Sequence, residues 1–194
     1  MSAMWGDLRK RLRSSRLLAV LSRVLLLSAL MFVVWRVSAA VLPQGMLRPF
    51  FSGRFSTVVG EFTFWKVFLP NLLVGLLGVQ FMNLFRVGKR PGGSYVLPVF
   101  WVLYGLLLGT NSFVFAGQPV PLSVSVLWTR TGFSELLAYT LGYEASRQWS
   151  VWEQATLWAA PRRMAGKWKP RAGDAAYWVM GLLLLVWAVA REVH

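Results

Sequence analysis

Apolar residues along this chain gather in five long runs separated by short polar segments. About 20 helical residues cross a bilayer hydrocarbon core of about 30 Å, and the runs approach or exceed that length. The pattern predicts an all-α fold, a polytopic transmembrane helical bundle of about five spans with interfacial amphipathic helices. It forms a single membrane domain over residues 1–194. The predicted spans cover about residues 17–42, 67–85, 95–116, 120–143 and 175–190.

The first apolar run also fits a cleaved signal peptide, because Val37-Ser38-Ala39 matches the small-residue pattern of a cleavage site. The apolar region of a signal peptide is usually about 7–15 residues long, and this run is longer. We therefore interpret it as a membrane span. Arg23 and Arg36 lie near its two ends, where long side chains extend to the interface.

The segments between the spans are rich in basic residues and aromatic rings. Residues 1–16 alternate basic and apolar positions as an amphipathic segment that lies on an anionic leaflet. Residues 43–66 predict an aromatic loop with a short helix in the headgroup layer. A tight turn is expected within 86–94. The basic, tryptophan-rich segment 144–173 predicts a helix along the membrane surface that ends before Pro161.

The distribution of lysine and arginine predicts the orientation. With the N-terminus inside, the cytoplasmic segments hold fourteen basic residues and the outer segments hold four, provided that there are five spans. The positive-inside rule then predicts a multi-pass protein of the inner (cytoplasmic) membrane with a cytoplasmic N-terminus. Topology accounts for most of the net charge of +14. A nucleic-acid partner, the other interpretation of that charge, is therefore not expected.

The residue types present argue against most enzyme classes. The chain has no cysteine, and its one histidine is the last residue, His194. Thiolate sites, haem ligation and histidine-assisted nucleophiles therefore lose their usual groups. Neither a glycine-rich phosphate loop nor a G-x-S-x-G elbow occurs. We expect no catalytic residues, no metal site and no cofactor, and an intramembrane enzyme is the least favoured class.

The fourth predicted span contains a candidate polar site. Of the seven acidic residues, only Glu135 falls deep inside a predicted span, and Arg130 lies five residues before it. Five residues correspond to about 140° of helical rotation, so the two side chains do not share one straight face. Either the helix breaks near Gly132 or each charge has a partner on another helix. An ionisable side chain at this depth either forms part of an ion, proton or substrate site, or it links two helices through a hydrogen bond or ion pair. The lack of a second buried carboxylate favours a structural link between helices.

Small and polar residues predict how the spans pack. Gly105 and Gly109 are four residues apart in the third span, and Ala138 and Gly142 repeat that spacing in the fourth. Such pairs allow helix backbones to approach closely. Asn71 follows Pro70, where a helix is prone to kink. Polar residues in or at the ends of the second and third spans are expected to bond between helices: Asn71, Gln80, Asn83 and Asn111.

Three motifs over about residues 65–145 resemble the stage II sporulation protein M family. Pro70–Gly78 is similar to its asparagine-led second helix, and Tyr104–Gly109 to its glycine-containing third helix. Thr131–Ala138 resembles the family's most characteristic element, a His-Gly followed three residues later by Glu. Thr131 replaces that histidine, so any chemistry of the histidine does not carry over. Pro70 and Tyr104 stand where asparagine is common.

The resemblance implies a bacterial membrane protein that works within a complex and singles out Gly132 and Glu135. The sporulation member belongs to a peptidoglycan-degrading assembly whose hydrolytic work is done by partners. Relatives in other bacteria are often encoded near ABC transporter genes. We expect a non-enzymatic membrane subunit that contacts lipids and other protein subunits, as a hetero- or homo-oligomer. The alternative is a transporter subunit with a polar path near Arg130 and Glu135.

Overall fold

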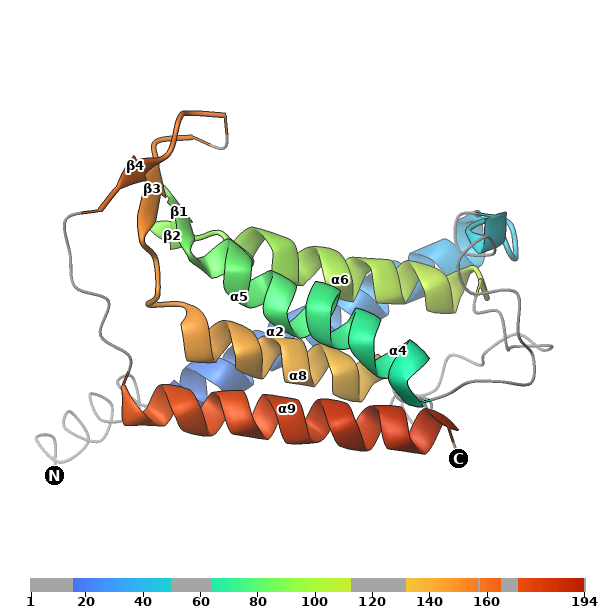
Figure 1. Cartoon of the computed structure of the whole chain (residues 1–194). Helices are drawn as coiled ribbons and strands as arrows, with labels where there is room; N and C mark the ends of the chain where they lie inside the picture. Colours follow the sequence, from blue (N-terminus) through green and yellow to red (C-terminus); the bar gives the residue numbers. More distant parts are fainter. Residues whose placement is uncertain (1–15, 50–63, 113–131, 157, 165–170, 194) are drawn as a thin grey trace, which may run out of the picture.

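A computed structural model describes residues 16–49, 64–112, 132–156, 158–164 and 171–193 (Figure 1). In the described part, five helical rods run side by side and alternate in direction, with a small sheet at one end of the rods. The first rod is α2, Arg16–Val41, which contains no proline or glycine. It ends just before Pro43, whose missing N–H cannot continue the helical pattern.

The other rods occupy the remaining predicted apolar runs. The second comprises α4 (Phe64–Pro70), a π-helix η1 (Asn71–Leu76) and α5 (Leu77–Asn83). The third, fourth and fifth are α6 (Gly93–Gly109), α8 (Gly132–Ser146) and α9 (Ala172–Val193).

Two predicted boundaries were wrong. The third span was expected to reach residue 116, but α6 ends at Gly109 because Asn111 adopts a left-handed φ of 46°. A left-handed residue just after a helix is a common terminator. The fourth span was expected over 120–143, yet α8 continues to Ser146; residues 120–131 lie outside the described part of the chain.

The segment predicted as a surface helix, 144–173, instead contributes strands. β3 (Trp152–Gln154) and β4 (Arg162–Arg163) join β1 (Phe85–Val87) and β2 (Arg90–Pro91) in the order β2-β1-β3-β4. The β1–β3 pair is parallel and the other two pairs are antiparallel. The fold is therefore mostly helical rather than all-α.

Backbone pairing explains why this segment is not a helix. Strand β1 directly follows α5 and offers a free edge, and the N–H groups of Val151 and Trp152 both donate to the carbonyl of Leu84, at 2.8 and 2.9 Å. Tertiary hydrogen bonds of this kind commonly override a weak local preference. The aromatic and basic spacing that suggested a helix is thus compatible with strands.

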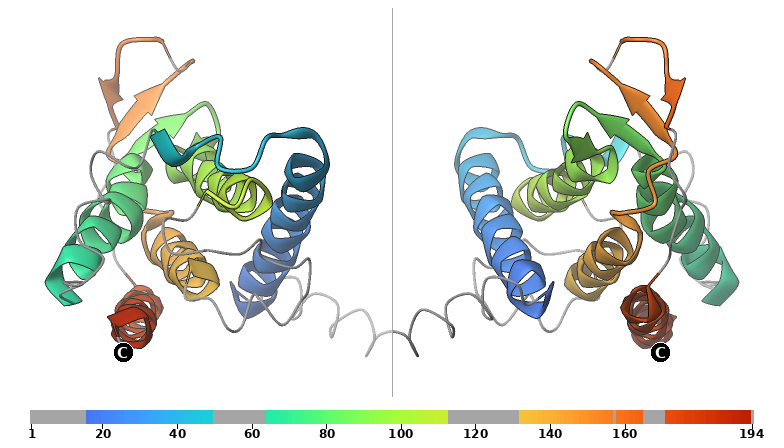
Figure 2. Two further views of the ribbon diagram at one scale, coloured as in Figure 1. Left: turned by 90° about the vertical axis from the view of Figure 1, so that its right-hand side faces the viewer. Right: turned by 90° about the vertical axis from the view of Figure 1, so that its left-hand side faces the viewer.

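Helix α8 forms the centre of the bundle. It contacts α2, α5, α6, α9 and η1, and the turned views in Figure 2 show the other rods around it. Ten of its fifteen residues are buried. The main hydrophobic cluster combines its Leu136 and Tyr139 with residues from every other rod, including Met31, Trp101 and Leu185. The position of α8 therefore determines how the remaining helices meet.

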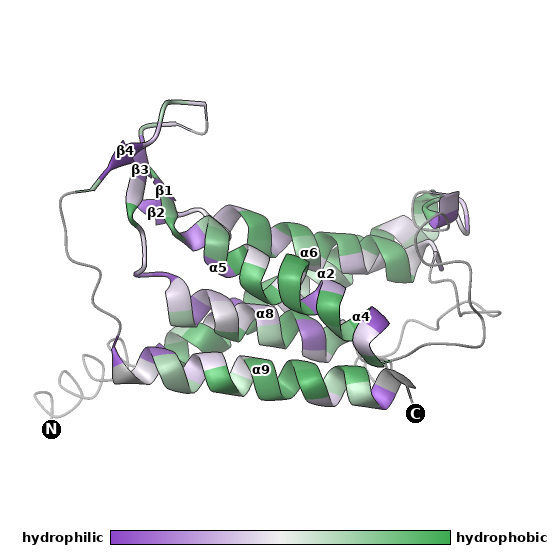
Figure 3. Cartoon of the chain, viewed as in Figure 1, coloured by the Kyte–Doolittle hydropathy of each residue, from purple (hydrophilic) through white to green (hydrophobic). Residues whose placement is uncertain are grey.

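The outer surfaces of the rods are apolar. Leu26 of α2, Val74 of η1 and Leu183 of α9 are 72%, 63% and 63% exposed. Figure 3 shows hydrophobic residues along the rods, whereas β2 and β4 at their end are hydrophilic. In the described residues, three helices are long and apolar enough to cross a membrane: Arg16–Val41, Phe64–Asn83 and Gly173–Arg191. The apolar helix α6 is shorter.

Candidate functional site

A chain of hydrogen bonds links the second rod to α8 at the predicted polar site. The Asn71 side-chain Nδ2 donates to Glu135 Oε1 at 2.6 Å, and the Tyr139 hydroxyl donates to Asn71 Oδ1 at 2.9 Å. Glu135 and Tyr139 are four residues apart on α8, so their side chains share one face. Asn71 bridges them because its amide carries both a donor and an acceptor. The structure thus brings together Asn71 and Glu135, two of the four predicted site residues.

The backbone around Asn71 is unusual. Pro70 ends α4 in a helical conformation, and the chain continues as the π-helix η1, closed by a hydrogen bond from Leu77 N–H to Leu72 O. A proline within a helix removes one N–H donor and crowds the preceding turn. A π-helical turn accommodates that crowding without ending the rod, and such turns occur frequently at functional sites. The sequence had suggested a kink at this position.

Two glycines bring aromatic rings close to this site. A Cβ placed on Gly75 would overlap the Tyr139 ring, and one on Gly132 would overlap the Tyr104 ring of α6. Gly75 lies one turn after Asn71, so its bare backbone makes the space in which Tyr139 reaches Asn71. Gly132 is the first residue of α8. Arg130, the remaining predicted site residue, lies outside the described residues.

The four predicted packing residues lie at helix contacts. A Cβ added to Gly105 or Gly109 would lie 2.7 Å from the backbone oxygen of Met31 or Trp35, respectively, so α6 contacts α2 there. Ala138 is fully buried, and its carbonyl oxygen lies 3.0 Å from the Cβ position of Gly181 in α9. A Cβ on Gly142 would overlap the side chain of Leu76 in η1.

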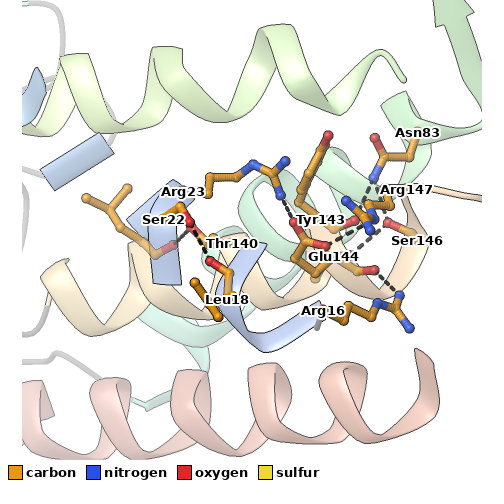
Figure 4. Close-up of polar contacts among 12 residues, drawn as sticks. Arg16, Leu18, Ser22, Arg23, Asn83, Thr140, Tyr143, Glu144, Ser146 and Arg147 are labelled. Carbon is orange, nitrogen blue, oxygen red and sulfur yellow. Dashed lines mark hydrogen bonds and ion pairs between the residues drawn. The ribbon is translucent and has the colours of Figure 1, made fainter. Parts of the chain in front are cut away.

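A second polar cluster, which the sequence analysis missed, lies at the end of α8 next to the sheet (Figure 4). Glu144 is fully buried and forms ion pairs with Arg23 of α2 and, at 3.1 Å, with Arg147. The Arg23 guanidinium also lies 4.4 Å from the centre of the Tyr143 ring. The expectation that only Glu135 lies deep among the helices was wrong, because α8 extends past residue 143.

Arg16 extends this cluster to α9. It donates to the backbone carbonyl of Glu144 and pairs with Asp174 at 2.5 Å, and Asp174 accepts a hydrogen bond from the Arg171 N–H at 2.9 Å. Arginine and carboxylate therefore connect α2, α8 and α9 at one end of the bundle. Two features of the sequence could have indicated this cluster. Arg23 lies inside the first predicted span, where a charged side chain requires a partner, and Glu144 lies three residues before Arg147, a spacing that allows an ion pair on one helix.

The predicted interhelical hydrogen bonds are confirmed for three of four residues. In addition to Asn71, Gln80 Oε1 accepts from Trp178 Nε1 of α9 at 3.2 Å. Asn83 donates to Tyr143 O and Ser146 Oγ of α8, and its Oδ1 accepts from Gly93 N–H. Asn111 differs, because it ends α6, where its backbone carbonyl accepts from Arg48.

These arrangements hold helices together through buried polar contacts, and Glu135 places one carboxylate beside an amide and a phenol. Among the described residues, no three His, Cys, Asp or Glu side chains cluster as metal ligands would. No family model, curated protein or solved structure matches the chain. The resemblance to the stage II sporulation protein M family therefore stays a prediction from its motifs.

Proposed function

We propose that this chain is a five-span protein of the bacterial inner (cytoplasmic) membrane that anchors or organises a larger complex without catalysing a reaction itself. Its N-terminus lies in the cytoplasm, and the resemblance to stage II sporulation protein M agrees with this role. The observation that carries the proposal is the separation of surface types. Apolar residues cover the sides of the rods, and between the rods Asn71 bonds to Glu135 and Arg23 pairs with Glu144.

Charge supports the orientation. The end of the bundle with the sheet carries the basic residues of β1, β2 and β4 together with Arg16, Arg147 and Arg171. Basic residues concentrate on the cytoplasmic side of bacterial membrane proteins. Helices α6 and α8 have 17 and 15 residues, so they are shorter than the other rods. Short helices can still cross a membrane, because the bilayer thins locally around them and because they contact longer neighbouring helices.

Cysteine labelling tests this topology, since the native chain has no cysteine. Met46 and Thr156 are exposed; Met46 follows α2 and Thr156 follows β3, and these two elements end at opposite ends of the bundle (Figure 1). In intact cells, an impermeant maleimide should label Met46→Cys and not Thr156→Cys, which should react only after permeabilisation. The unsubstituted chain is the blank. External labelling of Thr156→Cys would contradict the proposed orientation, and failure to recover stoichiometric partners in mild detergent would contradict the role in a complex.

A transporter subunit is the second candidate function. The specific observation that favours it is the Glu135–Asn71–Tyr139 chain beside a π-helix, because ionisable groups at membrane depth often mark ion or proton paths. In this alternative, Glu135 binds the transported cation or proton, and Arg130 contributes to the same path. In the first proposal, the same chain only links two helices.

Substitution of Glu135 separates the two functions. If the link is structural, Glu135→Gln should lower stability by about 0.5–1.5 kcal/mol, since an amide oxygen still accepts from Asn71 but without charge. Tyr139→Phe is the matched variant, because it removes the other hydrogen bond of the chain and should have an effect of similar size. Thermal unfolding in detergent measures both. A Glu135→Gln variant of normal stability that loses solute movement in reconstituted vesicles would support the transporter.

A further inference from the structure

The strand register gives the small sheet two chemically different faces. Phe85 pairs with Trp152, which pairs with Arg163, so these three side chains lie on one face. Val87 pairs with Arg90 and Gln154 and shares that face, because side chains two residues apart point the same way. We call this set the aromatic-basic face. It combines two aromatic rings and a valine with two arginines and no carboxylate.

The opposite face largely balances its own charge. Arg86 pairs with Glu153, and Glu153 pairs with Arg162, so the register places an acidic residue between two arginines. The remaining partner there is Pro91. The arginines of the aromatic-basic face have no such acidic neighbour in the register. The two faces therefore differ in their attraction for an anionic surface.

Contacts with α5 indicate where the aromatic-basic face points. The Phe85 ring packs edge-on against the Phe81 ring with 5.7 Å between centroids, and Phe81 is 59% exposed on the apolar side of α5. The face is therefore continuous with the side of the bundle that meets lipid in the proposed membrane protein. In the proposed topology, this continuity turns the face toward the bilayer rather than along the bundle axis into water.

The sheet also extends sideways past the helices. Figures 1 and 2 both show β3 and β4 projecting beyond α5 and α6, at the end where α5 and α8 finish. In the proposed orientation this is the height of the cytoplasmic headgroups. Trp158, between β3 and β4, is 94% exposed. Tryptophan concentrates at the headgroup level, and arginine there attracts anionic lipids.

We propose that the aromatic-basic face is a binding surface for anionic phospholipid headgroups of the cytoplasmic leaflet, in the lipid next to α5 and α6. Arg90 and Arg163 contact lipid phosphates, while Phe85 and Trp152 insert between headgroups. This inference rests on the proposed membrane topology. It specifies the ligand class and the residues that bind it, in place of the surface helix expected from the sequence.

Neighbouring arginines on opposite faces of β4 provide the test. The full chain is reconstituted in nanodiscs of phosphatidylcholine with a minor fraction of phosphatidylglycerol, and native mass spectrometry measures the lipids that stay bound. Phosphatidylglycerol should be enriched on the native chain. Arg163→Gln should reduce that enrichment about fivefold, the effect of roughly one basic residue at an anionic surface. Arg162→Gln removes the same charge from the other face and should stay close to the native value.

A spin label reports the direction of the face independently. A nitroxide on Gln154→Cys should collide mainly with oxygen, which concentrates in the bilayer, and one on Glu153→Cys mainly with a water-soluble nickel complex. Equal losses in Arg162→Gln and Arg163→Gln, or no enrichment on the native chain, would overturn the proposal. So would loss of a co-purifying protein from Arg163→Gln with lipid enrichment unchanged, which would indicate a protein occupant. Labelling of Met46→Cys and Thr156→Cys in intact cells, as described above, tests the proposed topology separately.

Discussion

Replacing Glu144 by glutamine should destabilise the bundle more than any other single change of charge described above. The substitution removes the charge of the fully buried Glu144 carboxylate, and it leaves the guanidinium groups of Arg23 and Arg147, which are 28% and 29% exposed, without their ion-pair partner. Breaking a fully buried ion pair by removing one partner typically costs about 3–5 kcal/mol, and the partly exposed arginines of this cluster reduce the expected loss to about 2–3 kcal/mol. Thermal unfolding in detergent should show a midpoint lower by on the order of 10 °C.

Controls distinguish this ion pair from a general effect of charge. Glu153→Gln removes an exposed carboxylate of the sheet and should leave the unfolding midpoint unchanged. The double variant Arg23→Gln/Glu144→Gln should be more stable than the sum of the single losses predicts, because the two side chains interact directly. Strict additivity, or a Glu144→Gln variant with the native midpoint, would show that the cluster contributes little to the fold.

The second large effect is expected at the contact between α2 and α6. In Gly109→Ala, the added methyl group would overlap Ser38 Oγ and lie 2.7 Å from the Trp35 carbonyl oxygen and 2.9 Å from the Ala39 nitrogen. Two of these three neighbours are backbone atoms, which cannot move without shifting the helix. Overpacking of this kind typically costs about 1–3 kcal/mol, and Gly109→Leu should cost more.

Gly78→Ala is the matched control, because it also adds one methyl group to a helical glycine. Its nearest neighbour would be the Leu73 carbonyl oxygen at 3.4 Å, an ordinary contact. Alanine favours a helix over glycine by about 1 kcal/mol, so this variant should be neutral or slightly stabilised. If Gly109→Ala and Gly78→Ala unfold at the same temperature, close packing of α2 on α6 does not limit stability.

Much of the helical fold could be predicted because hydrophobic runs report helices directly. Leu25, Leu26 and Val33 belong to a run whose length alone indicates α2. The strands could not be predicted in this way. β1 and β3 have three residues each, and Trp152 lies 67 positions after its partner Phe85 in the sequence. No local pattern encodes such a pairing, since it forms only after α5 and α8 finish at the same end of the bundle.

The polar site was partly predictable for a similar reason. Asn71 and Glu135 stood out because polar residues inside apolar runs require partners, and the structure pairs them. Glu144 did not stand out, because the predicted span ended at residue 143 and left it in a surface segment. Helix α8 continues for three more residues, to Ser146, and this places Glu144 within the bundle. Sequence reasoning locates helix ends only to within a few residues, and this carboxylate lies inside that margin.

The central position of α8 has a consequence for biosynthesis. Ribosomes deliver the helices in chain order, so α2, η1 and α6 leave the ribosome before the helix that all of them contact. Arg23 and Asn71 therefore emerge before Glu144 and Glu135, their partners in the finished bundle, have been synthesised. An arginine exposed to hydrocarbon is costly, and so is an unpaired amide. If the chain is the membrane protein proposed above, we expect the early helices to wait at the insertion machinery or near the interface, and the arrival of α8 to be the step that commits the chain to its final assembly.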